Sequence, residues 1–147
     1  ALRVFNVYGP GMRPGPYAGV VLRFIEALLR GEAPVIYGDG MQTRDFVYVD
    51  DVARAHVMAL AGRASGIFNV GSGVETRIID LYRMVCGEIG WCPEPRHEER
   101  RPGDVTRSVA DISRIRETLG WQPEISLEEG VRRTITYYKS KLAETHT

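Results

Sequence analysis

The stretch of sequence that decides the fold class runs from residue 37 to residue 52 and reads YGDGMQTRDFVYVDDV. Its Gly38-Asp39-Gly40 segment predicts a tight turn, and the residues between Arg44 and Val49 alternate as they do in a strand. Asp50 is a residue type that caps helices, so a helix should follow and continue to about Ala61. A turn, a strand and a helix in immediate succession indicate a layered α/β fold.

The same succession continues on both sides of this stretch. Runs of apolar and branched residues predict strands over 2–8, 34–37 and 66–70, the first and last of them followed by glycine-rich loops. Residues 93–109, rich in Pro, Glu and Arg, should form an extended loop with one or two short strands. We therefore expect one α/β unit over residues 1–147.

Apolar residues at helical spacing predict helices over 18–30, 76–89 and 111–119. On the first of these, Arg23, Glu26 and Arg30 should face away from the apolar stripe. A last helix should begin after residue 126, because a serine there and a glutamate three residues later form a capping box.

The composition is that of a folded protein with no large charged surface. The chain has 147 residues, of which 44% are apolar and 26% charged, and 19 basic residues balance 19 acidic ones. This balance argues against a broad basic surface for nucleic acid or for an anionic membrane. No apolar run is long enough for a transmembrane helix, and the first residues do not resemble a signal peptide, so we expect a cytoplasmic protein. The first residues already read as a strand with no initiating Met, which predicts a fragment.

The cysteines and histidines indicate no metal site. Cys86 and Cys92 match no zinc-binding spacing, and we expect them to be reduced thiols. The three histidines, His56, His97 and His146, form no ligand set.

Two patterns suggest cofactor chemistry, but the residues around them do not support it. Gly9, Gly11 and Gly15 lie between a predicted strand and a predicted helix, but one gap is a residue too long for a dinucleotide-binding loop. Three prolines also stiffen this loop and remove amide donors that a pyrophosphate would need, so a structural loop is favoured. Tyr137 and Lys141 have the spacing of a proton-transfer pair, but no glycine-rich loop lies beside them. A chance occurrence of this spacing is therefore favoured over a proton-transfer pair.

Longer strings carry a family resemblance. They occur in the order LRVFNVYGP (2–10), YGDG with RDFVYVDDV (37–52), FNVGSG (68–73) and RPGDV (101–105), and LGWQP with SLEEG follow near the end. The whole chain resembles the C-terminal half of the extended short-chain dehydrogenase/reductases, the NAD-dependent nucleotide-sugar epimerases and dehydratases. It looks most like the UDP-glucose 4-epimerase branch. The resemblance implies an α/β substrate-binding part that contains the last strands of a Rossmann-type parallel sheet.

The resemblance also implies what this half of the family lacks. The glycine loop that seats NAD, the catalytic Ser or Thr and the Tyr-x-x-x-Lys pair belong to the part of the family upstream of residue 2. We therefore expect NAD to be the cofactor of a full-length parent, and this chain alone to bind no NAD and to be inactive. The parent is implied to be a homodimer, and we expect this chain to self-associate through its exposed sheet.

By the same resemblance, the ligand is a UDP-sugar. Arg44 and Arg101 would hold its diphosphate as two guanidinium forks, with Asn6 as a neutral donor beside them. Asp104 would accept hydrogen bonds from the ribose hydroxyls. Without the family strings, the two arginines would read as surface residues and Asp104 as a loop cap.

Other positions would border the base and the nicotinamide. Val21, Ile36 and Tyr37 would flank the base, although Leu22 stands where family members commonly carry Pro. Val4 and Phe5 would border the nicotinamide pocket of the parent. Two alternatives stay open: a fragment of a nucleotide-sugar dehydratase or decarboxylase, and a stand-alone, non-catalytic nucleotide-sugar binding module. The choice between uracil and thymine and the identity of the sugar also stay open.

Overall fold

The first predicted strand is divided in the computed structural model, which describes residues 1–147. It breaks at Phe5 into β1 (Leu2–Val4) and β2 (Asn6–Tyr8). β1 pairs in parallel with β6 (Phe68–Val70), and β2 pairs in parallel with β5 (Phe46–Tyr48). At the break, the Phe5 N–H donates to the carbonyl of Val70 and the Asn6 N–H donates to that of Asp45. One extended segment therefore joins two strand pairs.

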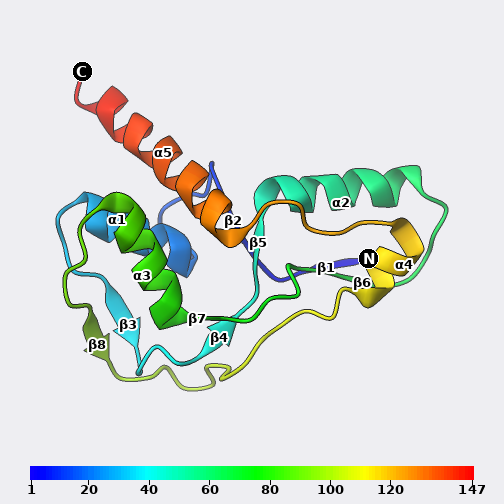
Figure 1. The fold of residues 1–147 in the computed structure, drawn as a ribbon, viewed down its shortest axis with the longest axis horizontal. Helices are drawn as coiled ribbons and strands as arrows, with labels where there is room; N and C mark the ends of the chain where they lie inside the picture. The colour runs from blue at the N-terminus through cyan, green and yellow to red at the C-terminus, as the bar shows by residue number, and fades with distance from the viewer.

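The remaining elements confirm the α/β class and the parallel pairing. A third parallel pair joins β3 (Val35–Tyr37) to β8 (Arg96–Glu98), and an antiparallel pair joins β4 (Thr43–Arg44) to β7 (Thr76–Arg77). The helices are α1 (Val20–Leu29), α2 (Val49–Ala61), α3 (Ile78–Ile89), α4 (Ser113–Leu119) and α5 (Leu127–Thr145). Figure 1 shows α2 and α4 beside β1 and β6 at one end of the molecule, and α1 and α3 beside β3 and β8 at the other.

β5 is covered on both faces, as parallel strands usually are. Phe46 and Tyr48 of β5 belong to a core of 15 buried residues that includes residues of α1, α3 and α5. Val47, between them, belongs to a second core of nine buried residues that includes Ile115 of α4 and Trp121. All three residues of β5 are therefore buried, although the sequence pattern predicts alternation.

The predicted strand over 44–49 is interrupted at a buried aspartate of the central string, Asp45, between β4 and β5. The carboxylate of Asp45 accepts hydrogen bonds from the backbone N–H groups of Ser72, Gly73 and Ala110 and from the Ser72 hydroxyl, at 2.7–3.0 Å. To do so, Asp45 leaves the strand ladder between β4 and β5. A Cβ at Gly71 would lie 2.6 Å from the Cβ of Ala110, so this glycine permits the close approach.

Asp51 anchors the other end of the string. Its carboxylate accepts from the N–H groups of Glu124 and Ile125 at 3.0 and 3.1 Å and pairs with Arg54 at 3.0 Å. Its carbonyl accepts the indole N–H of Trp121 at 2.9 Å. The segment that leads into α5 is thus held against the start of α2.

The predicted helix ends are only partly correct. Ser126 accepts from the Glu129 N–H at 3.2 Å, which confirms it as the N-cap, but the Glu129 carboxylate pairs with Arg132 and Arg133, so only this half of the capping box forms. The prediction that Asp50 caps its helix is wrong, because α2 begins one residue earlier, at Val49, and Asp50 lies in its first turn. An acidic residue there still stabilises the positive end of the helix dipole.

The expectation of reduced thiols is also wrong, because Cys86 and Cys92 form a disulfide. α3 ends at Gly90, which adopts a left-handed conformation with φ of 91°. This reversal brings the two Cα atoms to 4.9 Å, a distance that a bridge requires and that sequence spacing does not show.

None of the helices combines the length and the apolar character that a membrane span needs.

Candidate functional site

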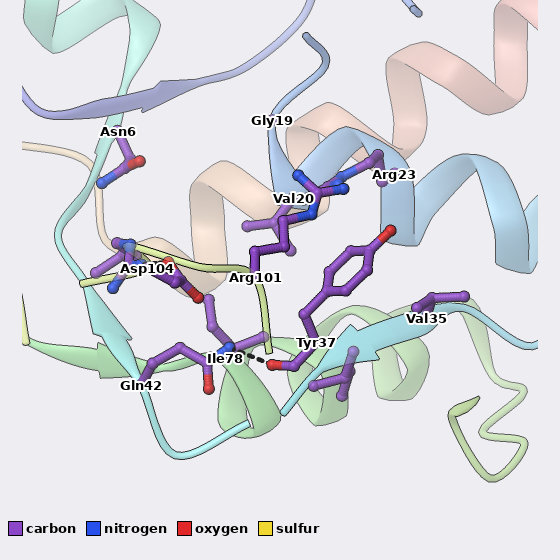
Figure 2. Close-up of a pocket in the computed structure, with 12 residues that line it drawn as sticks. Asn6, Gly19, Val20, Arg23, Val35, Tyr37, Gln42, Ile78, Arg101 and Asp104 are labelled. Carbon is purple, nitrogen blue, oxygen red and sulfur yellow. Dashed lines mark hydrogen bonds and ion pairs between the residues drawn. The ribbon is translucent and has the colours of Figure 1, made fainter. Parts of the chain in front are cut away.

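A cavity of about 250 Å³ lies where α1, β3, β4 and the loop after β8 meet. Figure 2 shows Asn6 and Asp104 on one side of it, Arg23 and Tyr37 on the other, and Arg101 between them. The residues that line it are Asn6, Gly19, Val20, Arg23, Val35, Ile36, Tyr37, Gln42, Arg44, Ile78, Arg101 and Asp104. The structure thus brings together six of the seven substrate-binding residues predicted from the sequence, all except Val21.

The β3–β8 pair positions Tyr37 and Arg101. Tyr37 is the last residue of β3 and lies in register with Glu98, the last residue of β8. Because the two strands are parallel, their carboxyl ends lie together, and the segment that follows β8 therefore begins beside Tyr37. The Arg101 guanidinium accordingly lies over the Tyr37 ring, 4.0 Å from its centroid, in a cation–π contact.

A turn fixes the backbone beyond Tyr37. The Gly38 N–H donates to the carbonyl of Glu98 at 2.8 Å, and the Gln42 side-chain amide donates to the carbonyl of Tyr37 at 2.8 Å. Gly38 and Gly40 have φ values of 78° and 80°, which glycine adopts without strain. The glycine turn predicted here is confirmed, and it leads the chain around the cavity into β4.

Arg44 and Asp104 pair with each other at the cavity wall. Arg44 Nη2 donates to Asp104 Oδ1 at 2.5 Å, and Arg44 Nη1 donates to the carbonyls of Thr43 and Val105 at 2.6 Å each. Three of the five guanidinium N–H groups are therefore used, and two remain. Asp104 Oδ2 makes no hydrogen bond within the chain, so this carboxylate keeps one free acceptor.

Arg23 is a cavity residue that the sequence pattern places incorrectly. Helical spacing predicts that it faces away from the apolar stripe of α1, but it is half-buried and lines the cavity. Burial and the nearby Arg101 guanidinium both lower the pKa of Arg23. The spacing correctly sets Arg23 outside the apolar stripe, and only the position of β3 and the loop after β8 makes that side of the helix a cavity wall.

The remaining predicted residues lie elsewhere. Val21 is buried in the larger core, and its neighbour Val20 lines the cavity instead. Val4 is 36% exposed, and Phe5 packs against the smaller core, so neither reaches this cavity. Their role beside a nicotinamide stays a prediction.

The loop over residues 9–16 does not have the form of a pyrophosphate-binding loop. Residues 9–16 include three prolines without amide donors, and α1 begins only at Val20, so the glycine loop does not run directly into a helix N-terminus. Tyr137 and Lys141 lie on α5, outside the cavity, where Glu144 pairs with Lys141 at 3.1 Å and raises its pKa.

Residues 1–71 match the family model described as the NAD dependent epimerase/dehydratase family. The chain belongs to this family. It is 48% identical over 138 residues to UDP-glucose 4-epimerase of Mycolicibacterium smegmatis, covering 92% of this chain and 44% of that protein. It is 34% identical over 145 residues to UDP-N-acetyl-alpha-D-glucosaminuronate decarboxylase of Bacillus cytotoxicus, covering 94% of this chain and 45% of that protein.

Solved structures of family members show the same fold. The structure of UDP-glucose 4-epimerase from Thermotoga maritima with UDP-glucose matches with a TM-score of 0.93 and 43% identity, over 96% of this chain and 46% of that one. The structure of UDP-glucose 4-epimerase from Thermus thermophilus in complex with NAD matches with a TM-score of 0.84 and 37% identity, over 94% and 45%. The chain thus spans less than half the length of these relatives.

Proposed function

We propose that this chain carries the nucleotide-sugar site of an enzyme like UDP-glucose 4-epimerase, with NAD as the cofactor of the whole enzyme. One observation carries the proposal. Asn6, Arg44, Arg101 and Asp104 come from separate segments and line one cavity of about 250 Å³. Three arginines and one aspartate line this cavity, which suits an anionic ligand that also carries hydroxyl groups.

Each residue then has a task that its surroundings permit. Arg101 has all its guanidinium donors free of hydrogen bonds to the chain, and Arg44 has two left, so both can donate to phosphate oxygens. The Asn6 amide is exposed and adds a neutral donor. Asp104 Oδ2 can accept from a ribose hydroxyl while its other oxygen keeps Arg44 in place.

The part of this chain in the reaction is to bind the nucleotide sugar and to orient it. NAD would supply hydride transfer in the whole enzyme. Holding the diphosphate firmly allows the sugar to turn while the nucleotide stays anchored. The proposed site therefore needs binding arginines and no catalytic base.

A nucleotide-sugar decarboxylase or dehydratase is the second candidate. The 34% identity to the decarboxylase of Bacillus cytotoxicus supports this candidate. The identity to the epimerase of Mycolicibacterium smegmatis is 48%. Both reactions begin with a nucleotide sugar, so the same cavity serves either. The larger identity supports the epimerase.

Calorimetric titration of the 147-residue chain with UDP-glucose tests the proposed site. Arg44→Ala and Arg101→Ala should each weaken binding by about 1.5–3 kcal/mol, the range for hydrogen bonds to charged groups. Arg83→Ala is a matched control, because this exposed arginine lies on α3 away from the cavity. If both cavity variants bind like the parent chain, the diphosphate site is elsewhere.

A further inference from the structure

The positive charge in the cavity is unevenly balanced. Arg44 pairs with Asp104, the one carboxylate that lines the cavity. Arg23 and Arg101 form no ion pair and donate no hydrogen bond from their guanidinium groups within the chain. The uncompensated charge therefore lies on the side of the cavity where these two arginines meet, above the Tyr37 ring (Figure 2).

The two unpaired guanidinium groups come from elements that hold them close together. Arg23 lies in the first half of α1, is half-buried and lines the cavity. Arg101 is held over the Tyr37 ring, on the side of the cavity where Arg23 also lies (Figure 2). Burial lowers the pKa of Arg23, and the Arg101 guanidinium lowers it further.

We infer that Arg23 is a ligand-binding residue that joins Arg101 in holding the diphosphate of a nucleotide sugar, and that it sets a preference for nucleoside diphosphates over monophosphates. The inference rests on the proposed function and adds to it a residue that the family resemblance did not supply. Two nearby guanidinium groups without a carboxylate partner repel each other, and a group with at least two negative charges relieves that repulsion. A diphosphate offers one phosphoryl group to each arginine, while a monophosphate reaches both less well.

This arrangement divides the work among three arginines. Arg44 uses three of its five donors to hold Asp104 and two carbonyl groups, so it fixes the wall of the cavity beside the ribose and has two donors left for the phosphates. Arg23 and Arg101 keep all their donors for the ligand. Removing Arg23 should therefore weaken contacts to phosphate and leave contacts to the nucleoside unchanged.

Calorimetry of the full chain with UDP, UMP and uridine tests this division. In Arg23→Met, which keeps the aliphatic part of the side chain, UDP should bind about 10-fold more weakly or worse, and the advantage of UDP over UMP should shrink. Uridine binding should change by less than about 2-fold, because the nucleoside carries no phosphate. The parent chain should also lose UDP affinity more steeply with added salt than the variant does.

Arg30→Met is the matched control, because Arg30 lies at the end of the same helix, is exposed and is absent from the cavity. Arg30→Met should leave the affinities for UDP, UMP and uridine unchanged. An unfolding midpoint of Arg23→Met equal to that of the parent chain would show that this variant is folded. Arg23→Lys should recover part of the UDP affinity, since it restores the charge without the fork.

The possible failures are distinguishable. If Arg101→Ala weakens UDP binding and Arg23→Met does not, the proposed function stands and the inference about Arg23 is wrong. If Arg23→Met weakens uridine as much as UDP, Arg23 supports the nucleoside and not the phosphates, which also overturns the inference. If UDP and UDP-glucose do not bind the parent chain, the proposed function itself fails.

Discussion

Replacing Asp45 by Asn should destabilise the chain severely, although the two side chains have nearly the same shape. Asp45 is fully buried, with 0% of its surface exposed. One carboxylate oxygen accepts from the Ser72 N–H and hydroxyl, and the other accepts from the N–H groups of Gly73 and Ala110. The Asp45→Asn substitution exchanges one of these oxygens for an NH₂ group, which donates and cannot accept.

The magnitude follows from the donors left without an acceptor. Either orientation of the amide leaves two donors facing an NH₂ group, and each unsatisfied buried group costs about 1–3 kcal/mol. We therefore expect a loss of roughly 2–6 kcal/mol, a large part of the total stability of an ordinary domain. The loss should be concentrated where the loop over 71–73 and the segment at Ala110 meet β5.

Urea unfolding followed by circular dichroism measures this loss. With a slope of about 2 kcal/mol per molar urea, in the middle of the range for small proteins, the midpoint should fall by roughly 1–3 M. Asp39→Asn is the control, because Asp39 is exposed and accepts a single hydrogen bond, from the Met41 N–H at 2.9 Å. A midpoint for Asp45→Asn within the scatter of the Asp39→Asn control would show that the four donors do not depend on the carboxylate.

Three further outcomes are expected. The Arg107 guanidinium lowers the pKa of Glu75 to about 2, so the ion pair should stabilise the chain fully above pH 4.5 and lose its effect as the pH falls toward 2. In acid unfolding, Glu75→Gln should reduce the fall in stability over this pH range, and an unchanged fall would count against the pair. Reducing the bridge between Cys86 and Cys92 should lower the free energy of unfolding by about 2 kcal/mol, as expected for so short a loop, whereas equal urea midpoints with and without dithiothreitol would contradict this. The chain should self-associate through the free edge of β1, which light scattering across a dilution series would detect. A strict monomer at high concentration, with β1 amides protected from hydrogen exchange, would show that the backbone groups at this edge already have hydrogen-bond partners.

Local sequence was enough to establish the element types and the positions that need special backbone geometry. Alternation and helical spacing are local properties, so the helices and most strands could be predicted within a few residues. Gly38 and Gly40 mark the turn after β3, and Ser126 marks the start of α5, because each acts on atoms a few residues away. The family strings added most of the charged and polar residues that line the cavity, which no local rule supplies.

The roles of the charged residues, in contrast, depend on tertiary packing. Asp45 and Asp51 look alike in the sequence as acidic residues beside apolar runs, yet each is buried by hydrogen bonds from segments far along the chain. Arg23 looks like a solvent-facing helix residue, and it becomes part of a cavity because β3 and the loop after β8 close around α1. Hydrogen bonds and charge interactions depend on distances between side chains, and residues remote in sequence come within those distances only after the layers have packed.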